Sequence, residues 1–177
     1  GAHFEPLRGS GVMIKETEHI AMNLLAISVG LPRDVAWNGR TVTTAIFKEP
    51  VAGPVRLGKT NLDGDRQGDL KVHGAPNKTV CVYPSEHYAF WREALPGVEL
   101  PWGVFGENFS TAGMMENEIN IGDQFRIGSG LVVVTQPRMP CYKLGVKFGR
   151  EDVEELYLKT RRTGYYFSVL EEGVVSA

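Results

Sequence analysis

Short runs of apolar and β-branched residues, separated by turn-forming residues, recur along this chain and constrain its fold more than any other feature. Runs of this length and composition are typical of β-strands. Two of them flank Gly128-Ser129-Gly130, a sequence that predicts a hairpin turn. We expect strands at Leu24–Val29, Val42–Phe47, Val55–Leu57, Thr79–Tyr83, Ile119–Ile121, Gln124–Ile127, Leu131–Thr135 and Tyr165–Leu170.

Two longer segments have the spacing of helices instead. The first opens at Pro84–His87 and ends before Pro96, and the second covers Glu151–Arg161 with acidic residues in its first turn. Many short strands with two peripheral helices predict a mostly β fold, either a β-barrel or a strongly curved sheet decorated by helices. Because strands and helices do not alternate, a doubly wound nucleotide-binding fold is disfavoured.

Length and charge narrow the class of protein further. A chain of 177 residues fits one domain, and a formal net charge of -2 gives no reason to expect nucleic acid or an anionic membrane as partner. No apolar run approaches the roughly 20 residues of a transmembrane helix. With only two cysteines, Cys81 and Cys141, a disulfide framework is excluded and a single bridge is disfavoured, so we expect a reducing, cytoplasmic setting.

The first 22 residues differ from the rest of the chain. They lack the basic start, apolar centre and small-residue cleavage site of a signal peptide. Their opening, GAHFEPLRGSG, is typical of an expression-vector remnant, and Met13 or Met22 is a candidate natural start. We therefore expect a disordered N-terminus at residues 1–22 and a single domain at residues 23–177.

Two motifs near the middle of the chain are misleading. Gly53–Thr60 matches the P-loop pattern GxxxxGK[ST], but the turn-rich residues that follow it do not predict the helix that a P-loop requires. Asp63, Asp65 and Gln67 imitate a calcium loop, yet its twelfth position, where a glutamate is required, is Gly74. Zinc is disfavoured because the chain has neither a CxxC nor an HExxH pattern.

Cys141 is the candidate chemical centre. Two prolines restrict the backbone before it and two cations flank it: Pro137, Pro140, Arg138 and Lys143. Residues 142–148 have helical spacing, which places Cys141 near a helix N-terminus. Cations and helix N-termini favour the thiolate, the form that attacks electrophiles and binds metals. The alternative is a buried structural cysteine, as we expect for Cys81, which alternates with valines in a strand.

Basic and polar residues elsewhere supply further candidates. If the chain turns Arg138 and Arg162 inward around Cys141, they would bind an anionic ligand; the alternative is a solvated basic face, which we expect for Lys147, Arg150 and Lys159. The polar clusters Gly106–Asn108 and Arg162–Tyr165 would line a pocket or make turns. His73 is a surface residue or a group that titrates in a useful range.

Six ordered segments together resemble the MOSC domain family, named after the C-terminal domain of molybdenum-cofactor sulfurase, and more closely its small bacterial YiiM-like branch. They extend over roughly residues 24–170. The glycine that commonly follows the histidine–glycine pair in this family is Ala75 here, a small departure. The segments are Gly64–Asp69, His73–Lys78, Tyr83–Tyr88, Phe105–Phe109, Gln136–Leu144 and Arg162–Tyr166.

The resemblance implies a β-barrel-like fold and a molybdenum cofactor (molybdopterin) whose metal is bound by Cys141. Relatives reduce N-hydroxylated compounds, including N-hydroxylated purine bases, with electrons from an external flavoprotein. Protons would come from His73 or Glu107. The residues expected to hold the cofactor, besides Cys141, are Thr135, Gln136, Arg138, Lys143, Asn108, Arg162 and Gly164, with Glu107 beside the pterin edge.

Two alternatives remain open at this point. In the first alternative, Cys141 carries a persulfide and transfers its sulfur to an acceptor. The flanking cations would assist this chemistry because they lower the pKa of the thiol. In the other alternative the domain is a non-catalytic carrier of the molybdenum cofactor.

Overall fold

The computed structural model describes residues 1–7, 21–67 and 76–177. In chain order its elements are β1 (Glu5–Pro6), β2 (Asn23–Val29), β3 (Arg33–Trp37), β4 (Arg40–Thr44), β5 (Glu49–Val51), β6 (Val55–Leu57), the 3-10 helix η1 (Pro76–Lys78), β7 (Val80–Pro84), α1 (His87–Ala94), β8 (Phe109–Ala112), β9 (Gln124–Ile127), β10 (Gly130–Pro137), α2 (Lys143–Phe148), α3 (Asp152–Thr160), β11 (Tyr165–Glu171) and β12 (Gly173–Val175).

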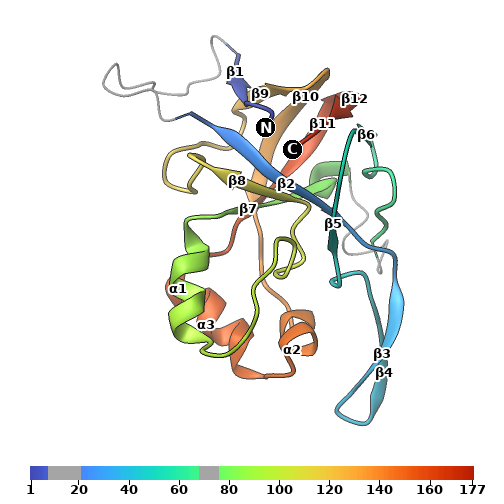
Figure 1. The fold of residues 1–177 in the computed structure, drawn as a ribbon, viewed down its shortest axis with the longest axis vertical. Coiled ribbons are helices and arrows are strands. Elements are labelled where there is room, and N and C mark those ends of the chain that lie inside the picture. The colour runs from blue at the N-terminus through green and yellow to red at the C-terminus, as the bar shows by residue number, and fades with distance from the viewer. Residues whose placement is uncertain (8–20, 68–75) are drawn as a thin grey trace.

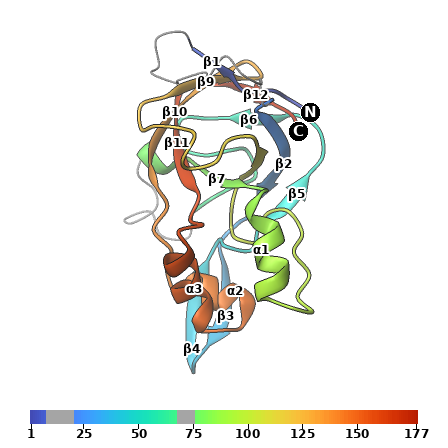
Figure 2. The same ribbon diagram turned by 90° about the vertical axis from the view of Figure 1, so that its left-hand side faces the viewer.

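Eight of these strands form one curved, mixed sheet in the order β1-β9-β10-β11-β7-β8-β2-β5. Strands β7 and β8 run parallel, and the other neighbours in this sheet run antiparallel. The sheet occupies one end of the molecule, and the three α-helices with the β3–β4 hairpin occupy the other (Figures 1 and 2). The prediction of a mostly β fold with peripheral helices is confirmed.

The predicted hairpin at Gly128-Ser129-Gly130 joins β9 to β10, with Ile127 paired to Gly130. Gly128 has a φ of 56°, in the left-handed region that disfavours a side chain. A Cβ at this position would lie 2.1 Å from the carbonyl oxygen of Val174. Glycine is therefore required both by the turn and by the strand packed against it.

Two predicted strands are wrong in part or in whole. The strand expected at Val42–Phe47 ends at Thr44, and the residues beyond it lead from the β3–β4 hairpin to β5 of the main sheet. The run Ile119–Ile121 forms a loop and turn, with Ile121 68% exposed. Conversely, β8 is a central strand that was not predicted, because its sequence Phe-Ser-Thr-Ala lacks an apolar pattern and its buried Ser110 depends on a hydrogen bond to Glu107.

The N-terminal residues that we excluded from the domain belong partly to the fold. Phe4 is buried in the main core, where its ring meets those of Phe109 and Phe125 edge to face. Strand β1 pairs with the edge of β9. Residues 8–20 lie outside the described part of the chain. In the structure, Ala2 and Phe4 thus pack into the core and β1 extends the sheet, although we expected the domain to begin at residue 23.

An aromatic cluster joins the helices to the end of the sheet. Trp91 of α1 and Tyr157 of α3 stack with centroids 5.4 Å apart, and the Trp91 indole donates a hydrogen bond to the Tyr83 hydroxyl (2.7 Å). Both predicted helices are confirmed, and the helix expected after Cys141 is α2. No helix of the described residues is long and apolar enough to cross a lipid bilayer.

Candidate active site

The segment between β10 and α2 holds Cys141 between two fixed points. Before it, the Arg138 amide donates to the carbonyl oxygen of Gly164 (3.0 Å). After it, the Cys141 carbonyl accepts from the Leu144 amide (3.0 Å), a bond that starts the turn into α2. Pro140 is buried and Cys141 is half-buried. The backbone on both sides of the thiol is thus anchored while the sulfur-bearing residue keeps access to solvent.

An open cleft of about 640 Å³, measured out to its mouth, lies beside Cys141. The lining comes from segments that are distant in sequence: Thr44, Ala45, Ile46, Lys48, Asp65, Gln67, Lys78, Cys81, Gly106, Asn108, Arg138, Met139, Cys141, Lys143 and Tyr166. Of the candidates named from sequence, the cleft brings together Cys141, Arg138, Lys143 and Asn108.

The described lining is strongly basic. It contains the cationic side chains of Lys48, Lys78, Arg138 and Lys143 against a single carboxylate, that of Asp65. In a partly desolvated cleft, positive charge attracts anionic ligands more strongly than on an open surface. The near-neutral charge of the whole chain therefore conceals a locally basic cleft.

Arg138 is fixed in the wall of the cleft. Its side chain is buried, and its Nη1 donates to the carbonyl oxygen of Phe105 (2.6 Å). Gly106 permits this approach: it has a φ of 80°, and a Cβ would lie 2.8 Å from Ile46 Cγ1 and 3.4 Å from the guanidinium. The predicted anion-binding role of Arg138 is consistent with this placement next to Cys141.

Lys48 and Asp65 form a buried ion pair in the same wall. Nζ and Oδ1 are 2.5 Å apart, and the two side chains are 8% and 2% exposed. Asp65 Oδ1 also accepts a hydrogen bond from the Gly30 amide (2.9 Å). The carboxylate that imitated a calcium ligand in the sequence thus holds a lysine in place. Nothing in the local sequence marked Lys48 as a site residue.

Cys81 lines the same cleft as Cys141, although the two differ in environment. Cys81 is 6% exposed, and its burial raises the pKa of its thiol, a rise that the nearby Arg138 guanidinium opposes. A thiol with a raised pKa stays protonated at neutral pH and is a poor metal ligand. The expected buried, inert role for Cys81 agrees with this burial, but its position in the cleft wall was not foreseen.

Glu107 has a structural environment that argues against the predicted proton-donor role. The side chain is fully buried, outside the described lining of the cleft. Its carboxylate accepts hydrogen bonds from the Gly103 amide (2.9 Å), the Phe105 amide (3.0 Å), the Ser110 hydroxyl (3.0 Å) and the Tyr88 hydroxyl. Burial raises the pKa of Glu107, against the effect of these hydrogen bonds. The carboxylate therefore fixes the loop that presents Gly106 to the cleft.

Asn108 lines the cleft, but its amide is occupied by backbone groups. Oδ1 accepts from the Cys81 amide (3.0 Å) and Nδ2 donates to the carbonyl oxygen of Ser28 (3.1 Å). The side chain bridges β7 and β2. The described contacts give Asn108 a role in shaping the cleft, and its predicted contact with a pterin stays a prediction.

Thr135 and Gln136 hold η1 rather than facing the cleft. Thr135 Oγ1 donates to the backbone carbonyl oxygen of Asn77 (2.5 Å), and the side-chain Nδ2 of Asn77 donates to Gln136 Oε1 (3.0 Å). These contacts place the neighbouring Lys78 in the cleft wall. The two residues predicted to contact the pterin therefore contribute through η1.

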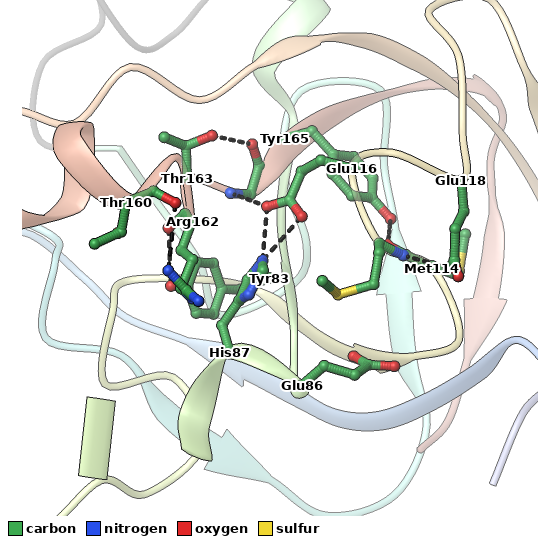
Figure 3. A network of polar contacts seen from close by, with 12 residues as sticks. Tyr83, Glu86, His87, Met114, Glu116, Glu118, Thr160, Arg162, Thr163 and Tyr165 are labelled. Atoms are coloured by element: carbon green, nitrogen blue, oxygen red, sulfur yellow. Dashed lines mark hydrogen bonds and ion pairs between the residues drawn. The ribbon is translucent and has the colours of Figure 1, made fainter. Parts of the chain in front are cut away.

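Arg162 and Gly164 lie away from the Cys141 cleft. The Arg162 guanidinium stacks over the ring of Phe90, 4.0 Å from its centroid, and faces the Tyr83–His87 side of the molecule (Figure 3). Gly164 has a φ of 71°, and a Cβ there would lie 2.4 Å from the Val82 carbonyl oxygen, so its glycine serves the backbone. Arg162 is therefore not part of the described lining that Arg138 shares with Cys141. His73 lies outside the described residues.

A second polar network ties these segments together. Nε2 of the buried His87 lies 2.9 and 3.0 Å from the two carboxylate oxygens of Glu116 (Figure 3). Glu116 Oε1 also accepts from the Gly164 amide (2.7 Å). Since the Gly164 carbonyl in turn accepts from the Arg138 amide, the network braces the backbone beside the cleft from α1.

We predict that Glu116→Gln weakens the fold near neutral pH and that its effect disappears in acid. Burial alone would raise the pKa of Glu116, but the hydrogen bond and charge of His87 hold it below its ordinary value of 4.5. The stabilisation is therefore present above pH 4.5 and is lost as the pH falls through the lowered pKa. Urea denaturation should show that the free energies of unfolding of the wild type and Glu116→Gln differ by about 1 kcal/mol at about pH 7. This difference should vanish as the pH is lowered to about 3. A difference that does not vary with pH would contradict this assignment.

The P-loop-like segment has a different role in the structure. It contains strand β6, and the described residues that follow, up to Gln67, form a bridge and a turn instead of a helix. The Lys59 ammonium, which would contact phosphate in a P-loop, donates to the carbonyl oxygens of Val169 (3.2 Å) and Leu170 on β11. This lysine joins β6 to the sheet.

Comparisons with known proteins agree with this geometry. The sequence model of the MOSC domain matches residues 69–177, and the chain belongs to the MOSC domain family. It is 46% identical to the uncharacterized protein YflK of Bacillus subtilis (strain 168) over 157 residues, which are 87% of this chain and 69% of YflK. The predicted resemblance to the YiiM-like branch is confirmed by a solved structure as well.

That structure is the crystal structure of YiiM from Geobacillus stearothermophilus. It matches with a TM-score of 0.71 and 38% identity, over 88% of this chain and 71% of the other. A more distant relative is a Gibberella moniliformis (strain M3125 / FGSC 7600) protein named "Reductase", 33% identical over 153 residues. The match covers 85% of this chain but 27% of that protein, so the shared unit is part of a much longer chain there.

Several lining residues were missed by the sequence analysis. Asp65, Gln67 and Lys78 lie in segments that carried the family resemblance, and that membership was the available signal. Tyr166 faces the cleft because it is paired with Cys81 across β11 and β7. Asp65 and Gln67 lie in a loop and Lys78 ends η1, so these positions depend on contacts between segments that are distant in the sequence.

Proposed function

We propose that this chain is a molybdenum-cofactor-dependent oxidoreductase that reduces N-hydroxylated compounds, such as N-hydroxylated purine bases, with the Cys141 thiolate as metal ligand. The observation that carries the proposal is the position of Cys141: a half-buried thiol beside a cleft whose described lining holds four cations and one carboxylate. A soft thiolate suits a thiophilic metal. The cations suit an anionic, phosphate-bearing cofactor.

The residues of the cleft fit such a cofactor in their chemistry. Cys141 would hold the metal, while Lys143, Lys48 and Arg138 would neutralise its anionic groups. Within residues 1–7, 21–67 and 76–177, no three His, Cys, Asp or Glu side chains cluster as a metal site. One protein thiolate suits a metal that brings further ligands of its own. When bound, the cofactor supplies the two-electron redox chemistry that these side chains lack.

Reduction of an N–OH group to N–H consumes two electrons and two protons and releases water. We propose that the electrons come from an external flavoprotein, because the sequence offers no dinucleotide-binding or iron–sulfur motif. The relative named "Reductase" supports a partnership of this kind, since three-quarters of its chain lies outside the shared unit. The anchored Arg138 and Lys143 would orient an anionic cofactor, and the buried walls would limit water around the reacting group.

Metal analysis and a turnover assay test the proposal. Protein purified from a cofactor-competent host should contain near-stoichiometric molybdenum and should reduce 6-hydroxylaminopurine with reduced methyl viologen as donor. Molybdenum without turnover of any N-hydroxylated substrate would favour a cofactor carrier. Cyanide-labile sulfur without molybdenum would favour the persulfide transferase.

Two basic residues that the sequence treated alike should behave differently. We expect Lys143→Ala to lower the molybdenum retained at high salt by about fivefold, equivalent to about 1 kcal/mol, because it removes a cation from the cleft. Arg162→Ala, whose guanidinium stacks on Phe90, should retain wild-type molybdenum. Gel filtration in increasing KCl followed by metal analysis measures both. Equal losses in the two variants would argue against the cleft as the anion site.

A further inference from the structure

One polar atom in the cleft has an unmet hydrogen-bonding requirement. Gln67 lines the cleft, and its Nε2 donates to the carbonyl oxygen of Lys78 (2.8 Å). This bond fixes the orientation of the amide, because a carbonyl oxygen accepts only from the NH2 side. Gln67 Oε1 is buried and, among the described residues, no donor reaches it.

An orphaned amide oxygen of this kind is costly. Leaving a buried acceptor unsatisfied destabilises a fold by about 1–3 kcal/mol, so buried polar atoms without partners are rare and frequently mark binding sites. Its neighbours in the cleft do not provide a donor. The Lys48 ammonium is held by Asp65 at 2.5 Å, and Asp65 is itself held by the Gly30 amide. The described part of the cleft wall thus leaves this acceptor open to a donor on a ligand.

We propose that Gln67 is a specificity-determining residue whose Oε1 accepts a hydrogen bond from an N–H or amino group of a heterocyclic ligand in the Cys141 cleft. This chemistry complements that of the basic lining. A phosphate or carboxylate presents acceptors, which Arg138 and Lys143 would bind and which an amide oxygen would repel. A heterocycle with an amino edge presents the donor that Gln67 requires. The cleft thus distinguishes the anionic part of a ligand from its amino-bearing ring.

The inference rests on the proposed function for the identity of that ring, which is either the pterin of the cofactor or the purine of the substrate. Both carry amino or ring N–H donors. A Gln67 variant should weaken cofactor retention if the donor belongs to the pterin, and should raise the KM if it belongs to the substrate.

Three variants separate ligand binding from structural anchoring. Gln67→Met removes the acceptor and the bond to Lys78. Gln67→Glu also loses the bond to Lys78 but keeps an acceptor oxygen. Thr135→Val loosens η1 without altering the acceptor, since Thr135 donates to the Asn77 carbonyl. If the acceptor is what matters, Gln67→Met should be impaired about tenfold, which corresponds to about 1.4 kcal/mol. Thr135→Val should stay within about threefold of wild type, and Gln67→Glu should lose no more than the roughly fivefold expected for one unit of charge in the cleft. If anchoring is what matters, all three should be impaired alike.

The measurements are molybdenum and pterin content after dialysis, KM and kcat for 6-hydroxylaminopurine with reduced methyl viologen, and calorimetric titration with 6-hydroxylaminopurine and with pterin-6-carboxylate. Lower pterin content in Gln67→Met assigns the donor to the cofactor, and a raised KM at unchanged kcat assigns it to the substrate. The titrations need no turnover, so they test Gln67 even where the wild type lacks molybdenum and the proposed function fails. Equal affinity of wild type and Gln67→Met for both heterocycles, with equal pterin content and KM, would overturn the inference.

Discussion

Cys141→Ala protein from a cofactor-competent host is expected to contain almost no molybdenum and to show no turnover of 6-hydroxylaminopurine. The variant removes the thiol that we propose as metal ligand and leaves the surrounding cations in place. Removal of a residue that hydrogen-bonds a metal ligand commonly lowers metal affinity by about 10–100-fold. Removal of the ligand itself should lower the affinity further. Elemental analysis of purified protein, normalised to protein concentration, measures the effect directly.

Cys81→Ala is the matched control. Both cysteines border the same cleft, but burial raises the pKa of the Cys81 thiol and hence disfavours its thiolate. We expect this variant to retain wild-type molybdenum, and to lose stability only through the small cavity that it creates. If Cys81→Ala loses as much molybdenum as Cys141→Ala, the assignment of Cys141 as the metal-binding thiol is wrong.

Glu107→Leu is expected to destabilise the protein by about 3–5 kcal/mol, the largest stability effect that we predict. The substitution leaves four donors in the core without their acceptor, those of Gly103, Phe105, Ser110 and Tyr88. For a domain of this size, the loss corresponds to a fall in Tm of about 10 °C. Urea denaturation and thermal unfolding measure it.

Glu107→Gln keeps the test informative if the leucine variant fails to fold. It retains one carboxamide oxygen as acceptor, so we expect a smaller loss of about 1–2 kcal/mol. The folded fraction of Glu107→Gln should keep wild-type kcat and an unchanged pH profile, because the carboxylate lies outside the described cleft lining. A variant with wild-type stability but a lost or shifted pH profile would restore the proton-donor role that the sequence suggested.

Local patterns anticipated those elements that depend on nearby residues. The hairpin at Gly128–Gly130, helix α1 before Pro96 and the strand β11 follow from turn chemistry and periodicity. Strand β8 escaped prediction because its polar residues are satisfied by tertiary hydrogen bonds, such as that between Ser110 and Glu107. The strand expected at Ile119–Ile121 failed because Asn120 separates the two isoleucines, of which Ile119 packs partly buried against the core while Ile121 is exposed in a turn.

The sequence by itself determined the mostly β class, the family resemblance and the position of Cys141 in a restrained, cation-flanked segment. Each strand-like run, each of the six family segments and the surroundings of Cys141 are defined by residues within a few positions of one another. The tertiary structure alone decided that Lys48, Gln67 and Lys78 meet Cys141 in one cleft, that Glu107 is buried and that Arg162 lies elsewhere. The physical reason is that strand pairing and side-chain packing join distant segments, and the direction of a charged side chain depends on which partners that packing provides.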